Sequence, residues 1–176
     1  GAFYMITSTG QIYSFREGGA GASVAFERFD TGLAPACEIE GLAYLAAEQS
    51  LIIACKRNQA RAMRETISLY AWRPGEAAAR PWRNYDGRSI AAAAGVSRFQ
   101  PSSVEFDAAS GRMLLLSARD GALAEFAPDG ALIAARALNS SHVQAESLAI
   151  TPDGGLLIGD EGGRGVAQLS RYGREP

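Results

Sequence analysis

Several residue types that build common functional sites are scarce in this chain of 176 residues. It has one histidine, His142, so a zinc site made of several histidines is excluded within the chain. Its two cysteines, Cys37 and Cys55, are too few for a disulfide-built scaffold and lack metal-ligand spacing. Neither a histidine-based metal centre nor a cysteine framework therefore accounts for this sequence.

An excess of positive charge and long hydrophobic runs are also absent. The 17 basic and 19 acidic residues give a net charge of −2, so nothing points to nucleic acid or an anionic membrane as a partner. The strongly apolar runs 51–55 and 113–116 have the length of a strand, far below that of a membrane span. Residues 1–8 lack the basic segment and apolar core of a signal peptide. The chain starts inside a strand pattern, so we expect upstream sequence in which such a signal could lie.

The sequence contains an internal repeat of short β-favouring runs separated by glycine, proline and aspartate turns. The first run of the repeat occurs at 40–44, 102–106 and 146–150. The second run occurs at 3–8, 51–55, 113–117 and 156–160. The third run occurs at 12–17, 67–72, 123–128 and 166–171. A fourth run follows the first three copies at 23–30, 77–85 and 131–138. Each copy is thus a four-stranded unit of roughly 45 residues, the size of a propeller blade.

The repeat predicts an all-β fold, a β-propeller of four-stranded antiparallel blades that is incomplete in this chain. About 3.5 blades are expected in a single domain, because the first unit lacks its innermost strand and the last lacks its outermost. The blades are placed at 2–34, 35–85, 99–140 and 142–176, with a short helix at 88–95 for which Ser89 can serve as the N-cap. A ring needs about four to eight blades, so we expect missing sequence or a second chain. An irregular β-sandwich is the alternative.

The candidate site is one rim of the propeller channel. The first strand of a blade begins, and the second ends, at the same rim. Pairing Tyr44 with Leu51 across the first hairpin places Glu40 opposite Cys55, and the same reasoning places Ser102 opposite Ser117 and Glu146 opposite Asp160. The ligand-binding candidates at this rim are Glu40, Lys56, Arg57, Ser102, Glu146 and Glu161.

The acidic rim residues have several interpretations. Hard cations need several oxygen ligands, so Glu40, Glu146, Asp160 and Glu161 are the predicted ligands of a Ca²⁺ ion. Alternatively, the glutamates accept backbone N–H groups or pair with Lys56 and Arg57. Two facing acids could also form a general acid/base pair, although no nucleophile with an adjacent base accompanies them.

Three further features are interpreted without a catalytic role. Cys37 is expected about 10 Å from Cys55 at regular strand rise, so a disulfide is not expected unless the chain folds back. His142 is expected in an exposed loop before an inner strand. The loop 57–65 carries three arginines that could contact an anionic ligand or simply be solvated.

Motifs in the second half of the chain resemble a known family. Pro101–Ser103, Leu116–Ser117, Gln144–Ser147 and Asp160–Glu161 are similar to the strand starts and strand ends of the SdiA-regulated β-propeller family. Ser103 and Ser147 depart from it, since the family usually has glycine there. The family is similar to esterase-like phytase propellers. The resemblance implies a ring of five or six blades, a mostly bacterial and extracytoplasmic or membrane-anchored location, a calcium site, and no settled activity.

Three functions follow as hypotheses. The first is an extracytoplasmic, non-enzymatic binding or scaffold module that uses the acidic rim, with or without Ca²⁺. The second is a phytase- or esterase-like, metal-assisted hydrolase at that rim. The third is a structural interaction domain whose open edges are completed by a partner chain, for instance in a homodimer.

Overall fold

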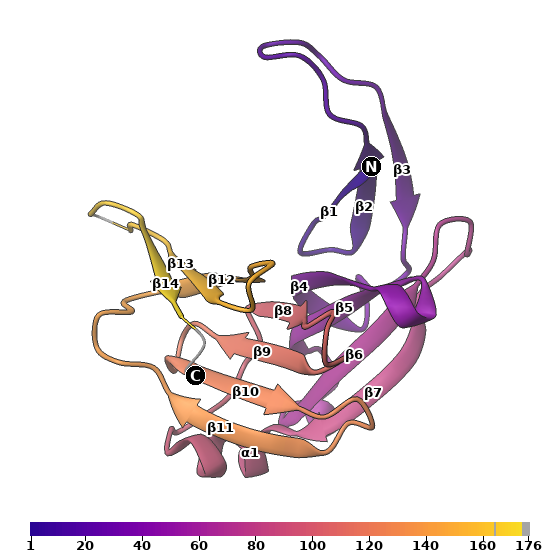
Figure 1. Ribbon diagram of the computed structural model, residues 1–176. Coiled ribbons are helices and arrows are strands. Elements are labelled where there is room, and N and C mark those ends of the chain that lie inside the picture. Colours follow the sequence, from indigo (N-terminus) through magenta and orange to yellow (C-terminus); the bar gives the residue numbers. More distant parts are fainter. Residues whose placement is uncertain (164, 174–176) are drawn as a thin grey trace.

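The computed structural model describes residues 1–163 and 165–173, which form four antiparallel sheets (Figure 1). The first sheet contains β1 (Phe3–Ile6), β2 (Gln11–Phe15) and β3 (Phe26–Asp30). The second contains β4 (Cys37–Leu45), β5 (Ser50–Asn58), β6 (Thr66–Trp72) and β7 (Arg80–Asp86). The third contains β8 (Ser103–Phe106), β9 (Met113–Ser117), β10 (Ala122–Phe126) and β11 (Leu132–Ala137). The fourth contains β12 (Ala145–Ile150), β13 (Leu156–Asp160) and β14 (Gln168–Tyr172).

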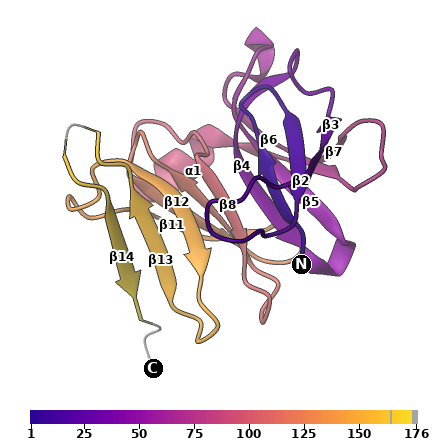
Figure 2. The same cartoon turned by 90° about the horizontal axis from the view of Figure 1, so that it is seen from above.

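The arrangement of these sheets agrees with the predicted repeat. Within the described residues the sheets have three, four, four and three strands, and hydrogen-bonded neighbours are consecutive in the chain. Figure 2 shows the sheets side by side in chain order, from the first two at the right to the last at the left. The strands β4, β8 and β12 lie next to one another on the inner side, with β1 against β4. The repeat therefore identified both the strand order and which strands lie innermost.

Short helices occur only between strands in the described residues. They are α1 (Gly87–Ala94) and the single-turn 3₁₀ helices η1 (Ala46–Glu48) and η2 (Arg61–Met63). The N-cap of α1 is Asp86, not Ser89 as predicted, because the Asp86 carboxylate accepts hydrogen bonds from the Arg88 amide and the Ser89 hydroxyl. These donors lower the pKa of Asp86 below its ordinary value. No helix in the described part of the chain is long and apolar enough to span a membrane.

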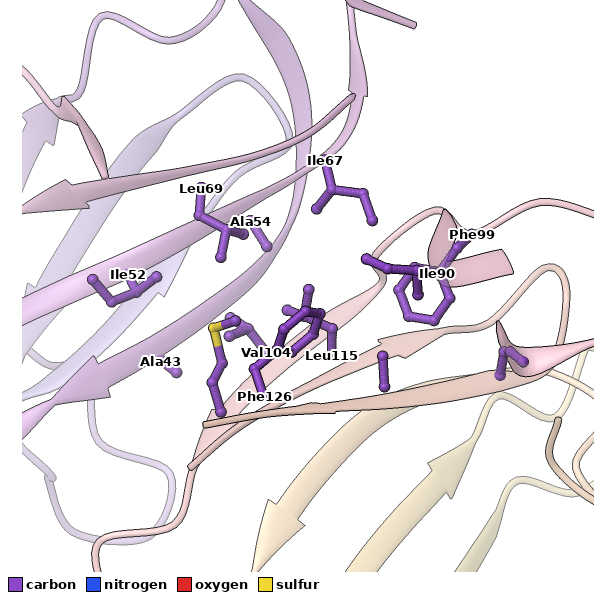
Figure 3. Close-up of a cluster of buried hydrophobic side chains, with 14 of the residues drawn as sticks. Ala43, Ile52, Ala54, Ile67, Leu69, Ile90, Phe99, Val104, Leu115 and Phe126 are labelled. Atoms are coloured by element: carbon purple, nitrogen blue, oxygen red, sulfur yellow. The ribbon is translucent and has the colours of Figure 1, made fainter. Parts of the chain in front are cut away.

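The largest hydrophobic core lies between the second and third sheets (Figure 3). Phe126, Leu115 and Ile52 are completely buried there, and Ile90 of α1 contributes to the same cluster. The inner strands β4 and β8 approach closely at Gly41, where a Cβ atom would lie 2.8 Å from Ala54 Cβ and 3.2 Å from Val104 Cγ1. A glycine is therefore needed at this point, because Ala54 of the paired strand β5 leaves no room for a Cβ atom and Val104 of β8 leaves little.

The two cysteines form a disulfide, which corrects the expectation from regular pairing. The Cα atoms of Cys37 and Cys55 are 5.7 Å apart, and both residues are buried in the core between the first two sheets. Two irregularities in the β4–β5 pairing, between Glu38 and Ile39 and between Ile39 and Gly41, pair Ile39 with Cys55. Cys37 still pairs with Asn58, three residues from Cys55, so the disulfide crosses the two strands diagonally where their pairing is irregular.

Reducing this disulfide should lower the free energy of unfolding by about 3 kcal/mol, because it releases a constraint on an unfolded loop of 18 residues. Urea unfolding with and without reductant measures the difference, and a double Cys37→Ala, Cys55→Ala variant should be insensitive to reductant. Equal unfolding midpoints in wild-type protein, with two free thiols titrated after reduction, would contradict this expectation.

Candidate functional site at the rim of the inner strands

Matching β-bulges place two glutamates at equivalent positions on inner strands. In β4, the pairs Ile39–Cys55 and Gly41–Ala54 leave Glu40 as the extra residue. In β12, the pairs Ala145–Asp160 and Ser147–Gly159 likewise leave Glu146 as the extra residue. The equivalence of the two glutamates is thus as predicted, but neither faces its predicted partner across the hairpin. Bulges re-aim side chains, and here they occur where inner strands begin.

A cavity of about 330 Å³ lies beside these bulges and joins three sheets. We call it the rim cavity. It is lined by Glu40, Lys56, Gln100, Ser102, Ala118, Arg119, Val143, Gln144 and Glu146. The structure therefore brings together four of the predicted ligand-binding residues: Glu40, Lys56, Ser102 and Glu146.

The other two predicted ligand-binding residues lie outside the lining of the rim cavity. Arg57 lines a separate cavity with Gln100, and Glu161 lines a shallow hollow beside Glu146. Sequence reasoning missed Gln100, Arg119 and Gln144. Each lies within three residues of the start of an inner strand or the end of a second strand. Pairing residues across the hairpins would have found them if the flanking loops had been included.

One side of the rim cavity is an ion pair. Lys56 Nζ donates to Glu40 Oε1 at 2.5 Å, and both side chains are about one quarter exposed. The pairing alternative considered from the sequence is thereby confirmed for Lys56. The second carboxylate oxygen, Glu40 Oε2, is buried and has no donor within the described residues. A buried acceptor without a donor is uncommon, and this one belongs to a side chain that lines the rim cavity.

Ser102 acts as a structural link rather than as an open ligand group. It is 3% exposed, and its Oγ accepts a hydrogen bond from the Ala118 amide. The same Oγ is 3.2 Å from the carbonyl oxygens of Leu116 and Ala145, to either of which it can donate its proton. Because Ala145 belongs to the fourth sheet, this serine connects the third and fourth sheets at the floor of the rim cavity.

Gln144 organises the acidic side of the rim cavity. Its side-chain Nε2 donates to Glu146 Oε1 at 3.0 Å and to Glu161 Oε2 at 2.7 Å. Its backbone N–H donates to Asp160 Oδ1, and its carbonyl oxygen accepts from the Glu161 amide. The amide side chain therefore holds two carboxylates that would otherwise repel each other.

The four predicted calcium ligands each have other partners in this arrangement. Within residues 1–163 and 165–173, no group of three or more acidic, histidine or cysteine side chains is placed to hold a metal ion. Calcium binding would require the Gln144 amide to turn so that its oxygen replaces its nitrogen between Glu146 and Glu161. The calcium site stays a prediction.

Burial raises the pKa of Glu105 in β8, and a hydrogen bond from the Phe106 amide partly offsets this effect. Glu105 is not part of the rim cavity lining.

Comparison with known proteins supports the fold but not a family. No family model matches the sequence, and no curated protein matches it. A gluconolactonase from Xanthomonas campestris is similar in structure, with a TM-score of 0.50 and 17% identity over 96% of this chain and 55% of that protein. A luciferin-regenerating enzyme has a TM-score of 0.55 and 12% identity over 98% of this chain and 60% of its own. A virginiamycin B lyase from Staphylococcus aureus has a TM-score of 0.52 and 6% identity over 98% of this chain and 55% of its own.

This chain is an incomplete β-propeller. At these identities the similarity shows the fold alone, and the chain spans between 55% and 60% of the length of these three proteins. Each sheet is a blade, and the rim cavity lies where the inner strands of three successive blades begin.

His142 is buried, which corrects the expectation of an exposed loop residue. Its side chain is 1% exposed, Nδ1 lies 2.6 Å from Asp160 Oδ2, and Nε2 lies 2.5 Å from the Tyr172 hydroxyl. The carboxylate can only accept, so Nδ1 is the donor, and in a neutral ring Nε2 accepts the Tyr172 proton. Both ring nitrogens are thus engaged, and His142 ties the start of the last blade to β13 and β14.

Replacing His142 with alanine should destabilise the protein by about 3 kcal/mol, because the carboxylate of Asp160 loses a partner in a buried site. Tyr172→Phe removes one hydrogen bond and should cost about 1 kcal/mol. Urea unfolding of both variants tests whether His142→Ala lowers the free energy of unfolding more than Tyr172→Phe does. If His142→Ala changed stability by less than Tyr172→Phe, the buried network would not have the structural role assigned to it.

Proposed function

We propose that this chain is a propeller module that binds a small, hydroxyl-rich molecule in the rim cavity. The observation that carries the proposal is the convergence of three blades on one cavity whose lining is mostly polar. Its volume of about 330 Å³ lies at the lower end of the range for small-molecule sites, roughly 300 to 1,000 Å³. The site is formed by strand ends, which the surrounding sheets hold in place.

The chemistry of the lining supports this class of ligand. Lys56, Arg119 and the side-chain amide of Gln100 are donors, while the carboxylates of Glu40 and Glu146 are acceptors. A ligand with several hydroxyl groups can donate to the carboxylates and accept from the cations at once. Apolar lining is limited to Ala118 and Val143, so a purely hydrophobic ligand would leave most polar groups unpaired.

We also propose an extracytoplasmic location and a relationship to the SdiA-regulated propeller family. The disulfide between Cys37 and Cys55 supports an extracytoplasmic location, because such bonds persist in oxidising compartments. The motifs that resemble the SdiA-regulated propeller family also support an extracytoplasmic location, and they suggest a bacterial source.

Two alternative functions have less support. For the metal-assisted hydrolase, Asp160 would have to act at the rim, but its carboxylate is bound by His142 and the Gln144 amide. For the interaction domain, the apolar side chains of Phe3, Met5 and Phe26 are about half exposed or more on the first blade. A mass twice that of one chain in sedimentation equilibrium would favour this last alternative.

The ligand proposal is tested with a panel of sugars and polyols in titration calorimetry. Replacing Glu146 with glutamine removes the charge but keeps the shape, and should weaken binding about tenfold, as expected for one charge-assisted hydrogen bond. Glu125→Gln is the matched control, because Glu125 is also a partly exposed strand glutamate but pairs with Arg112 away from the rim cavity.

Binding that is unchanged in Glu146→Gln, or lost equally in Glu125→Gln, would contradict this assignment. A panel without any saturable binding up to about 10 mM would remove the proposed function, since such weak binding corresponds to less than roughly 3 kcal/mol.

Calcium is tested separately, as part of the same proposal. Glu146 and Glu161 share the Gln144 amide, and turning that amide would offer three oxygen ligands to Ca²⁺. Millimolar Ca²⁺ should then raise the thermal unfolding midpoint of the wild type by mass action, and Glu146→Gln should abolish the shift. Mg²⁺ at equal concentration is the control for ionic strength. Equal midpoints with and without Ca²⁺ in the wild type would exclude calcium from the rim.

A further inference from the structure

A second cavity, of about 400 Å³, lies next to the rim cavity and contains three arginines. We call it the arginine cavity. Arg57 and Arg64 come from the end of β5 and the loop that follows it, and Arg98 comes from the segment that leads into β8. The second and third blades therefore each contribute guanidinium groups to one hollow. Gln100 lines both cavities.

Two of these guanidinium groups have no partner within the described residues. Arg57 pairs with Glu38 at 2.8 Å, whereas Arg64 and Arg98 form no ion pair or side-chain hydrogen bond there. Elsewhere in the chain, Arg80, Arg88, Arg112 and Arg171 each lie within reach of a carboxylate. Unpaired cations gathered in one cavity repel each other, and an anionic ligand would remove that repulsion.

The loops that carry the arginines are held in place by buried contacts. Asn58, 6% exposed, donates from Nδ2 to the carbonyl oxygens of Met63 and Thr66, which closes the loop around Arg64. Arg98 precedes Phe99, which is buried in the interblade core. The Gln100 amide donates to the Ser117 hydroxyl. The backbone beneath these guanidinium groups is therefore fixed before any ligand binds.

The charge of the arginine cavity indicates the kind of anion. Its lining contains three guanidinium groups and the carboxylate of Glu65; because Arg57 is already paired with Glu38, the two unpaired positive charges are those of Arg64 and Arg98. Glu65 also lies 3.7 Å from Arg88, which further offsets its charge. A phosphate monoester carries a charge close to −2 and three strong acceptor oxygens, and guanidinium forks match that geometry. A carboxylate offers two oxygens and one charge.

We infer that the arginine cavity is a binding site for the phosphate group of a small-molecule phosphate monoester. This inference does not depend on the ligand of the rim cavity, although the two cavities adjoin at Gln100. The site is formed by Arg64 and Arg98 from two blades, with Arg57 at its edge.

Phenyl phosphate is the probe, titrated by calorimetry at pH 7.5 and constant ionic strength. We expect saturable binding that is at least about tenfold tighter than that of phenyl sulfate, which has one charge less. Arg64→Gln and Arg98→Gln should each weaken phenyl phosphate binding about tenfold. Arg61→Gln is the matched control, because Arg61 lies in the same loop but outside the cavity lining. It should change affinity by less than about twofold.

Three outcomes would overturn the inference. The first is the absence of saturable phenyl phosphate binding to the wild type, and the second is an equal loss in Arg61→Gln, which would indicate a general charge effect. The third is loss in Lys56→Gln with no change in Arg64→Gln and Arg98→Gln. That result would move the anion to the rim cavity and leave the proposed function intact. Unchanged unfolding midpoints of the variants ensure that a lost signal reports binding.

Discussion

The close packing of the inner strands β4, β8 and β12 is the constraint on which the rest of the structure depends. Gly41 suits this close approach, because a Cβ atom there would overlap Ala54 of the paired strand and press against Val104 of β8. The apolar faces of the second and third blades then meet around Phe126 and Leu115, and α1 closes the outer side of that core. Ser102 extends the same contact to the fourth blade through the Ala145 carbonyl. With the inner strands in contact, their starting ends must share one rim.

Departures from regular pairing give that rim its chemistry. The bulges at Glu40 and Glu146 insert one residue into β4 and one into β12, and both carboxylates line the rim cavity. In the same irregular stretch Cys37 and Cys55 form a disulfide between β4 and β5, next to Lys56 of the rim cavity. A rigid base of this kind suits a binding site, because little conformational freedom remains to be lost when a ligand binds.

The two cavities differ in the state of their charges. In the rim cavity Lys56 pairs with one carboxylate oxygen of Glu40, and Gln144 holds Glu146 and Glu161 together, so most of the negative charge already has a partner. In the arginine cavity Arg64 and Arg98 have no carboxylate partner in the described residues. The first suits a neutral ligand with many hydroxyl groups, and the second suits an anion. His142, although it resembles a catalytic group in being paired with an aspartate, has both nitrogens occupied and serves the packing of the last blade.

The strand order and the equivalence of Glu40 with Glu146 could be predicted from the sequence, because a repeat with four apolar runs per copy, separated by turns, is a local pattern. The same local reasoning, the pairing of residues across each hairpin, predicted rim positions for Lys56, Ser102 and the two glutamates. The disulfide, the burial of His142, the cap at Asp86 and the separate arginine cavity could not be obtained in this way. The disulfide, the burial of His142 and the arginine cavity depend on irregular pairing or on the approach of segments distant in the chain, such as those that carry Arg64 and Arg98 or His142 and Tyr172. The cap at Asp86 is local, but it depends on the helix beginning at Gly87. Local patterning therefore determined which strands pair, while tertiary packing alone decided where their side chains meet, because a shift of one residue changes the face to which every side chain points.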